Sequence, residues 1–173
     1  MTDRVNNGGP SGPSASVAAG EQPQAKVRVV GQYIKDLSFE NPNVNKLIDG
    51  PGENPNLALE VNVNASQVGP DLFESAIEFK AHVTNKVGVI YDLELIYAGM
   101  FRLEQMPQQA MQPFLLINCP ALLFPFLRRL VADLTREGGF PPLLLDPIDF
   151  AQLYMRKQQE AAAGAQSGKP TTQ

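Results

Sequence analysis

Residues 72–102 read LFESAIEFKAHVTNKVGVIYDLELIYAGMFR, and apolar and polar side chains alternate through most of this stretch. Alternation of this kind is typical of β-strands with one buried and one solvated face. It is interrupted at residues 85–88, where Asn-Lys-Val-Gly favours a hairpin connection. The apolar face of the first strand would hold Phe73, Ser75, Ile77, Phe79, Ala81 and Val83, against Glu74, Glu78, Lys80, His82 and Thr84. In the second strand, Tyr91, Leu93, Leu95 and Tyr97 would lie opposite Ile90, Asp92, Glu94 and Ile96.

The same alternation occurs upstream, in residues 57–64 and 27–40. A turn at Gly69-Pro70-Asp71 and a loop over 41–55, rich in Pro and Gly, separate these strands from their neighbours. In the strand predicted over residues 27–40, one face would carry Val27, Val29, Tyr33, Leu37 and Phe39. The other would carry Arg28, Gln32, Asp36, Ser38 and Glu40, with Val30 and Ile34 as apolar exceptions.

Downstream, the spacing of apolar residues changes to three and four, which predicts a helix over 111–134. Its apolar stripe would consist of Leu123, Phe126, Leu127, Leu130, Val131 and Leu134. Gly138-Gly139 is typical of a helix end, and Pro113, Pro120 and Pro125 predict a start or a kink nearby. A second helix is expected to begin at Asp146, as the capping residue, and to fray after Glu160.

Four strands followed by two helices predict an α+β fold with a four-stranded antiparallel sheet, one face of which is covered by the first helix. We expect a single domain over residues 26–160. Residues 1–25 and 161–173 contain few large apolar side chains, so we expect a disordered amino-terminal arm and a disordered carboxyl tail.

The sequence offers little catalytic chemistry. His82 and Cys119 are its only histidine and its only cysteine, and they stand apart from any further ligand at metal-site spacing. No glycine-rich phosphate loop occurs. We expect His82 on a solvated strand face, Cys119 packed and unreactive, and the strand carboxylates to serve solubility. These features predict a protein that is not an enzyme and needs no cofactor or metal. A small-ligand-binding or catalytic α+β domain is the less favoured interpretation.

The charge balance limits the possible partners. With 14 basic and 18 acidic residues, the net charge is −4, which argues against nucleic acid as a partner. We find no apolar leader and no apolar run long enough for a bilayer, so we expect no direct membrane insertion. A lone thiol is compatible with a reducing cytoplasm, and we expect the protein to be cytoplasmic.

Three segments, in this order, resemble motifs of the SecB export-chaperone family. YIKDLSFENPN (33–43) is similar to Tyr-x-Lys-Asp-x-Ser-Phe-Glu-x-Pro-x in the family's first strand. CPALLFPF (119–126) is similar to Cys-Pro-x-x-Leu-Phe-Pro-Tyr, and GFPPLLLDPIDF (139–150) to Phe-Pro-x-Leu followed by Pro-x-Asn-Phe. The resemblance extends over residues 27–159.

The resemblance implies an ATP-independent holdase chaperone that keeps secretory precursors unfolded and delivers them to the SecA ATPase. It also implies a homotetramer, built as a dimer of dimers. Family members contact SecA through acids on the exposed sheet face, and the matching positions are Asp36, Glu40 and Glu94. The tail after Glu160 lacks the acids that are common in the family, so an auxiliary SecA contact by the tail is in doubt.

A holdase needs apolar surface that stays open to unfolded chains. We expect this surface in the two loops that bring apolar groups outward. The candidate residues for binding client peptides are Leu47, Ile48, Phe140, Leu143, Leu145 and, on the second helix, Tyr154. The same residues could instead complete the core. A SecB-like chaperone dedicated to a toxin–antitoxin pair is the alternative function.

Overall fold

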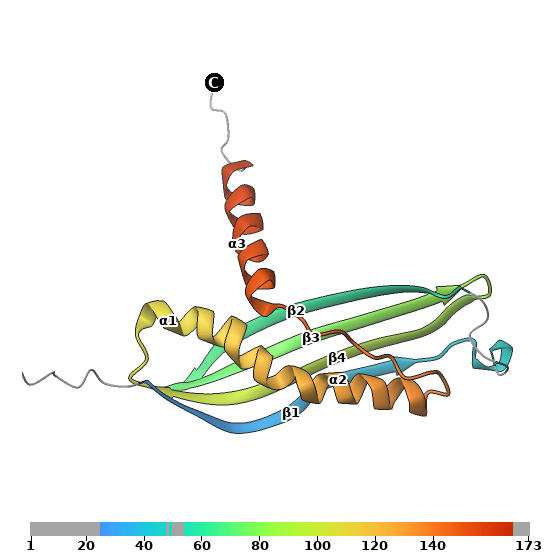
Figure 1. The fold of residues 1–173 in the computed structure, drawn as a ribbon, viewed down its shortest axis with the longest axis horizontal. Coiled ribbons are helices and arrows are strands. Elements are labelled where there is room, and N and C mark those ends of the chain that lie inside the picture. The colour runs from blue at the N-terminus through green and yellow to red at the C-terminus, as the bar shows by residue number, and fades with distance from the viewer. Residues whose placement is uncertain (1–24, 48, 50–53, 168–173) are drawn as a thin grey trace, which may run out of the picture.

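The computed structural model describes residues 25–47, 49 and 54–167, which form a four-stranded antiparallel sheet with helices along one side (Figure 1). The strands are β1 (Lys26–Glu40), β2 (Asn56–Gly69), β3 (Leu72–Asn85) and β4 (Gly88–Glu104), in the spatial order β1-β4-β3-β2. The helical elements are a single turn η1 (Val44–Lys46), α1 (Gln108–Pro113), a π-helical segment η2 (Phe114–Asn118), α2 (Cys119–Glu137) and α3 (Phe150–Ser167). The predicted fold class is confirmed. All of the predicted amino-terminal arm except residue 25 lies outside the described residues.

Both predicted turns connect neighbouring strands tightly. Asn85 pairs with Gly88 across the β3–β4 turn, and the Asn85 side-chain oxygen accepts a hydrogen bond of 2.8 Å from the Val87 amide. Gly88 has φ +127°, which favours glycine. In the β2–β3 turn, Asp71 has φ +53°, a conformation that Asp tolerates better than most residues.

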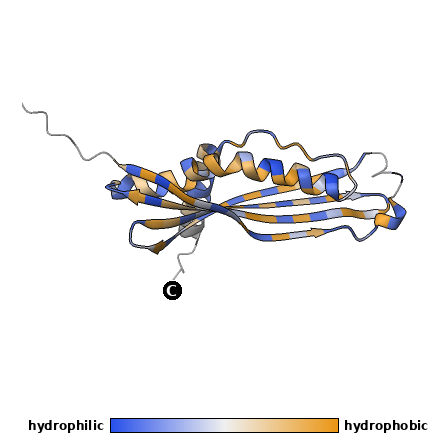
Figure 2. Ribbon diagram, turned by 90° about the horizontal axis from the view of Figure 1, so that it is seen from below, coloured by the Kyte–Doolittle hydropathy of each residue, from blue (hydrophilic) through white to orange (hydrophobic). Residues whose placement is uncertain are grey.

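The core lies between the sheet and the long helical run from α1 to α2. Figure 2 shows this run along one side of the sheet, and we call the opposite side, which no described helix covers over β1, β4 and β3, the open face. The core combines fully buried residues of the two central strands and of α2. They include Ile77 and Phe79 of β3, Leu93, Leu95 and Phe101 of β4, and Leu123, Leu127 and Val131 of α2. Within the predicted helix stripe, Phe126 departs from this pattern, since it is 43% exposed.

Cys119 is packed and chemically protected, as predicted. It lies at the start of α2 with a fully buried side chain. Burial raises the pKa of its thiol to about 12, so little thiolate forms near neutral pH.

β1 contains two irregularities that alter the predicted faces. Its pairing with β4 shifts between Val29 and Gly31 and again between Ile34 and Asp36. Each shift leaves one extra residue on β1, and one extra residue turns the following side chains to the other side of the sheet.

The faces predicted for the middle of β1 are therefore wrong. Ile34 pairs with Tyr97 on the helix side, whereas Tyr33 pairs with Ala98 on the open face. Gln32 also lies on the helix side, where its side-chain oxygen accepts a hydrogen bond of 3.4 Å from the Tyr97 hydroxyl. Simple alternation holds again after the second shift.

The expected irregularity in the first helix lies at η2, between Pro113 and Pro120. The Cys119 amide donates to the Phe114 carbonyl, five residues back, and in the same pattern Pro120 would have to donate to Leu115. Proline has no N–H, so the Leu115 carbonyl lacks that donor. The buried Ser75 hydroxyl of β3 supplies one, at 2.8 Å.

The second helix begins later than predicted. It starts at Phe150, and the capping residue is Asp149 rather than Asp146, because the Asp149 carboxylate accepts a hydrogen bond of 2.9 Å from the Gln152 amide. The sequence contains two Asp residues that could cap this helix, and the local pattern does not decide which of them does.

The helix also ends later than predicted, at Ser167 rather than near Glu160. Residues 161–163 are alanines, which have the highest intrinsic helix propensity and extend a helix without side-chain contacts. Residues 161–167 of the predicted tail are therefore helical, and residues 168–173 lie outside the described residues. α3 projects from the layered part of the molecule (Figure 1).

The helical run Gln108–Glu137 is long and apolar enough to span a membrane by length and composition. No apolar run of this length was expected from the sequence, because we looked for an uninterrupted run. One stripe of the run, which includes Leu123, Leu127 and Val131, is buried against the sheet, whereas Leu122 and Phe126 are exposed.

Candidate functional site

The two sides of the sheet carry different surfaces. Asp36, Glu40 and Glu94, which were proposed from the sequence to share a docking surface, lie together on the open face. Ser38 of β1 pairs with Glu94 of β4, and Asp36 and Glu40 lie on either side of Ser38 with the same orientation. Glu40 pairs directly with Asp92. We call Asp36, Glu40, Asp92 and Glu94 the acidic patch.

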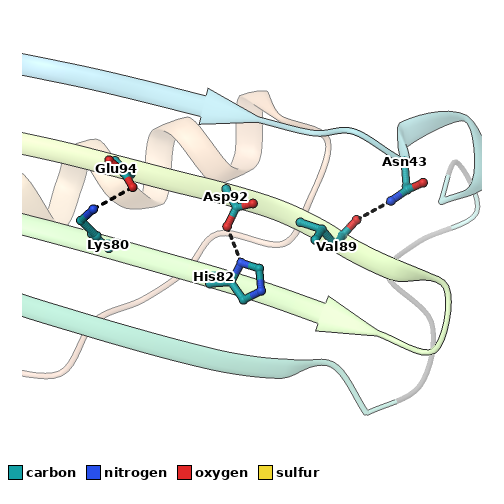
Figure 3. A network of polar contacts seen from close by, with 6 residues as sticks. All are labelled: Asn43, Lys80, His82, Val89, Asp92 and Glu94. Atoms are coloured by element: carbon teal, nitrogen blue, oxygen red, sulfur yellow. Dashed lines mark hydrogen bonds and ion pairs between the residues drawn. The ribbon is translucent and has the colours of Figure 1, made fainter.

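β3 supplies two basic side chains next to this patch. Figure 3 shows Lys80 and His82 directed from β3 toward the two acids of β4. Lys80 Nζ lies 2.8 Å from Glu94 Oε1, and His82 Nδ1 contacts Asp92 Oδ1. Within the described residues, Asp36 and Glu40 have no basic group within ion-pair distance. The outer strand of the patch therefore carries the carboxylates that are most available to a basic partner.

A second polar cluster occupies the middle of the open face. Glu74 accepts a hydrogen bond from the Tyr33 hydroxyl, and Lys35 Nζ lies 2.6 Å from its other oxygen. These contacts, with Lys35 contributing most, hold the pKa of Glu74 below its usual value. Burial, followed by the hydrogen bond to Glu74, raises the pKa of Tyr33 to about 12. The cluster fixes the irregular middle of β1 to β3.

The helix side of the sheet carries an apolar groove. A cavity of about 230 Å³ lies where the segment 139–149, which we call the crossover segment, passes over the ends of β2, β3 and β4. It is lined by Pro55, Leu57, Val83, Ile90, Tyr91, Phe140, Pro141, Pro142 and Leu143, a set without charged residues. Leu57 and Leu59 of the edge strand β2 are 42% and 45% exposed, which extends the apolar surface beyond the cavity.

The groove is held by a few specific contacts. Phe140 packs on Tyr91, with ring centroids 5.2 Å apart, and Tyr91 stacks on Phe39 at 5.6 Å. The buried Thr135 hydroxyl accepts a hydrogen bond of 2.9 Å from the Leu143 amide and donates to the Val131 carbonyl at 2.9 Å. The hydrogen bond from the Leu143 amide joins the crossover segment to α2.

The predicted client-binding residues fall into separate places. Phe140 and Leu143 line the groove, Phe140 mainly with buried surface. Leu47 and Leu145 are 6% and 5% exposed and belong to the core, as the alternative interpretation had it. Ile48 lies outside the described residues.

Tyr154 is not brought next to Phe140, contrary to the prediction. It lines a different cavity, of about 780 Å³, between α3, β2 and the helical run, together with residues such as Phe73 and Met111. Lys157 of α3 donates to the Val63 carbonyl of β2 at 3.3 Å beside this cavity.

Comparison with known proteins identifies the architecture. The family model described as preprotein translocase subunit SecB matches residues 20–161. The chain belongs to the SecB family. The predicted role of a chaperone in protein export, without enzymatic activity, is confirmed by this membership.

Close relatives of this SecB-family chain match over nearly their whole length. The protein-export protein SecB of Afipia carboxidovorans is 47% identical over 91% of this chain and 96% of the relative. That of Parvibaculum lavamentivorans is 43% identical over 98% and 99%. A SecB-like chaperone of Mycobacterium tuberculosis, solved in complex with an antitoxin peptide, has a TM-score of 0.56 over 70% of this chain and 90% of its own. At 16% identity it supports the fold alone.

Sequence reasoning missed part of the apolar groove. Leu57, Val83, Ile90 and Tyr91 had been placed only in strands. A usable signal existed for Leu57, because one helix covers only part of a four-stranded sheet and leaves an apolar edge strand uncovered. The contact of Tyr91 with Phe140 depends on the path of the crossover segment, which no local pattern encodes.

Proposed function

We propose that the chain is a cytoplasmic holdase that keeps secretory precursors unfolded without using ATP and delivers them to the SecA ATPase. The observation that carries this proposal is the separation of two unlike surfaces on one sheet. The apolar groove lies on the helix side, and the acidic patch lies on the open face. A client and a basic partner can therefore contact the same molecule without competing for the same atoms.

Client binding would use the groove and the apolar edge beside it. Unfolded chains expose the aliphatic and aromatic side chains that folded proteins bury, and each such side chain gains about 1.5–3 kcal/mol when it leaves water. The groove's lining lacks charge, so it selects for apolar character rather than for a sequence. Within the proposed client-binding set, Phe140 and Leu143 line this groove and are the residues that we propose contact clients.

Docking to SecA would use Asp36, Glu40 and Glu94. Exposed carboxylates attract a basic surface and accelerate its encounter, and their effect weakens with salt. Asp36 and Glu40 lie on the open face of β1, where a partner can approach from in front of the sheet.

Assembly into a homotetramer, as a dimer of dimers, is the further part of the proposal. The edge strand β1 has exposed Val29 and Ile34, and α2 has exposed Leu122 and Phe126. Apolar groups at a strand edge and on a helix are the kind of surface that a second copy covers. Several grooves on one assembly would raise the effective concentration for a long client.

Export rather than service to a toxin–antitoxin pair is favoured by the close relatives. The relatives that share 47% and 43% identity with this chain are export proteins, whereas the antitoxin-bound neighbour shares 16%.

A reciprocal pair of variants tests the division of labour. Asp36→Ala with Glu40→Ala should weaken SecA binding roughly tenfold, about 1.4 kcal/mol, and leave suppression of precursor aggregation unchanged. Leu57→Ser with Leu59→Ser should do the reverse, because these side chains extend the groove. Calorimetry with SecA and light scattering with a denatured precursor, both without ATP, measure the two effects.

Matched controls exist for both variants. Glu137→Ala with Asp146→Ala removes the same charge from exposed positions near the crossover segment. Val68→Ser removes an apolar side chain, 52% exposed, at the opposite end of β2. The assignment fails if the control pair weakens SecA binding as much as the patch variant, or if Val68→Ser impairs the holdase as much as the groove variant.

A further inference from the structure

The chain's only histidine, His82, borders the acidic patch. His82 contacts Asp92, and Asp92 pairs in register with Glu40, one of the two patch acids without an ion-pair partner in the described part of the chain. The side chains of His82 and Asp92 are 51% and 40% exposed, so both lie at the surface of the open face. Histidine is the residue type whose charge most often changes within the pH range in which proteins work.

The charged groups around His82 are nearly all acidic. On β4, Asp92 faces it directly, and Glu94 lies two residues along the same face. On β2, the opposite residue is Ala58, and Glu60 lies two residues along. On its own strand the neighbour on the same face is Lys80, which is already in contact with Glu94. Glu40 of β1 lies beyond Asp92.

We propose that His82 is a specificity-determining residue of the docking surface, which sets by its protonation how many carboxylates a basic partner can use. The proposal rests on the proposed docking of SecA at this patch. A protonated imidazole holds Asp92 in an ion pair and subtracts one negative charge next to Glu40. A neutral imidazole can still donate an Nδ1–H hydrogen bond to Asp92 but leaves the carboxylate's charge uncompensated.

Lys80 is the built-in comparison for His82. It makes the corresponding cross-strand contact one pair further along, with Glu94, at 2.8 Å. An ammonium group stays charged over the whole range in which an imidazole titrates. The two cross-strand contacts, Lys80 with Glu94 and His82 with Asp92, have similar geometry (Figure 3). The charge of the basic side chain is permanent in the first contact and depends on pH in the second.

The direction of the effect follows from the sign of the charge. A basic partner should bind more weakly below the imidazole's titration and more tightly above it. Exposed ion pairs contribute little each, so the change should be modest, roughly two- to fivefold in Kd. Salt should reduce it, because these charges are screened.

The test is calorimetry with full-length SecA at about pH 5.5 and about pH 7.5, on either side of the imidazole's titration. We expect the wild-type chain to lose two- to fivefold more affinity at the lower pH than His82→Gln loses. His82→Lys, which keeps a positive charge at both values, should bind weakly at both. Lys80→Gln should bind more tightly than the wild type at both values and retain its pH dependence.

The result that would overturn the proposal is an equal pH dependence in the wild type and in His82→Gln. Thermal melts at both pH values show whether each variant is folded, and the imidazole proton signals, unique in this chain, report whether His82 titrates over this range. Failure of the docking proposal itself looks different. In that case Asp36→Ala with Glu40→Ala retains full affinity for SecA, whereas a failure confined to His82 leaves the loss in that double variant intact.

Discussion

Thr135 joins the crossover segment to α2 through a single buried hydroxyl. The hydroxyl donates to the Val131 carbonyl and accepts from the Leu143 amide. Valine has nearly the same shape but no hydrogen-bonding group. Thr135→Val should leave the Leu143 N–H without a partner and lower the free energy of unfolding by about 1–3 kcal/mol.

Urea unfolding measures this loss. Thr135→Ser retains the hydroxyl and should bind clients as the wild type does, although the missing methyl group costs some stability. A Thr135→Val protein with wild-type stability and wild-type holdase activity would show that the crossover segment does not depend on this hydroxyl.

Glu74 makes stability depend on pH at the acidic side. The pKa of its carboxyl is held below the usual value by Lys35 and Tyr33, so the folded state favours the charged form. The corresponding stabilisation is present above the pKa of the unfolded chain and is lost as the pH falls through the lower folded-state value. Glu74→Gln should therefore flatten the decline of unfolding free energy between about pH 6 and about pH 3.

A series of urea titrations across this range measures the slope. Glu104→Gln, at the exposed end of β4, serves as the control and should keep the wild-type slope. If Glu74→Gln and Glu104→Gln decline in parallel, the cluster around Glu74 does not contribute to acid sensitivity.

At the scale of elements, a side chain of β3 supplies a hydrogen-bond donor that is missing within η2. Pro120 cannot supply the hydrogen that the Leu115 carbonyl needs, and Ser75 on β3 supplies it. Ser75→Ala should leave a buried carbonyl without a donor and destabilise the fold by about 1–3 kcal/mol.

The test of this pairing is the double substitution Ser75→Ala with Pro120→Ala. Alanine at position 120 restores an N–H to the helix, so the second substitution should recover part of the stability that the first removes, in a urea-unfolding double-mutant cycle. Strictly additive losses would contradict the repair.

The elements of the fold were predictable wherever a local pattern determines them. Alternation identified all four strands, and the change to a spacing of three and four identified the long helix. The middle of β1 was misassigned because two extra residues reverse the alternation. The sign in the sequence was the pair of apolar exceptions, Val30 and Ile34, which lie at the first shift and beside the second. The choice between Asp146 and Asp149 as the cap of α3 depends on the path of the chain before the helix.

The candidate site was predictable on the open face and only partly on the helix side. Asp36, Glu40 and Glu94 share a face because strand periodicity fixes their orientation, given the register. The groove combines residues from β2, β3, β4 and the crossover segment, and such long-range packing is not written in any one segment. Tyr154 was assigned to the groove because it is close in sequence, but the direction of α3 places it elsewhere.

At the scale of the whole molecule, the sheet separates two unlike surfaces. Its helix side presents an uncharged groove, and its open face presents carboxylates, with the thickness of the sheet between them. A chaperone without a motor needs this arrangement if its client is to remain bound while the partner docks.

The most direct measurement is calorimetric titration of SecA into the chain after it has been saturated with a denatured precursor, without nucleotide. We predict that SecA binds the loaded chain at least as tightly as the empty one, and that the precursor stays in the complex on gel filtration. Competition, in which SecA displaces the precursor or fails to bind the loaded chain, would contradict the separation of the two surfaces.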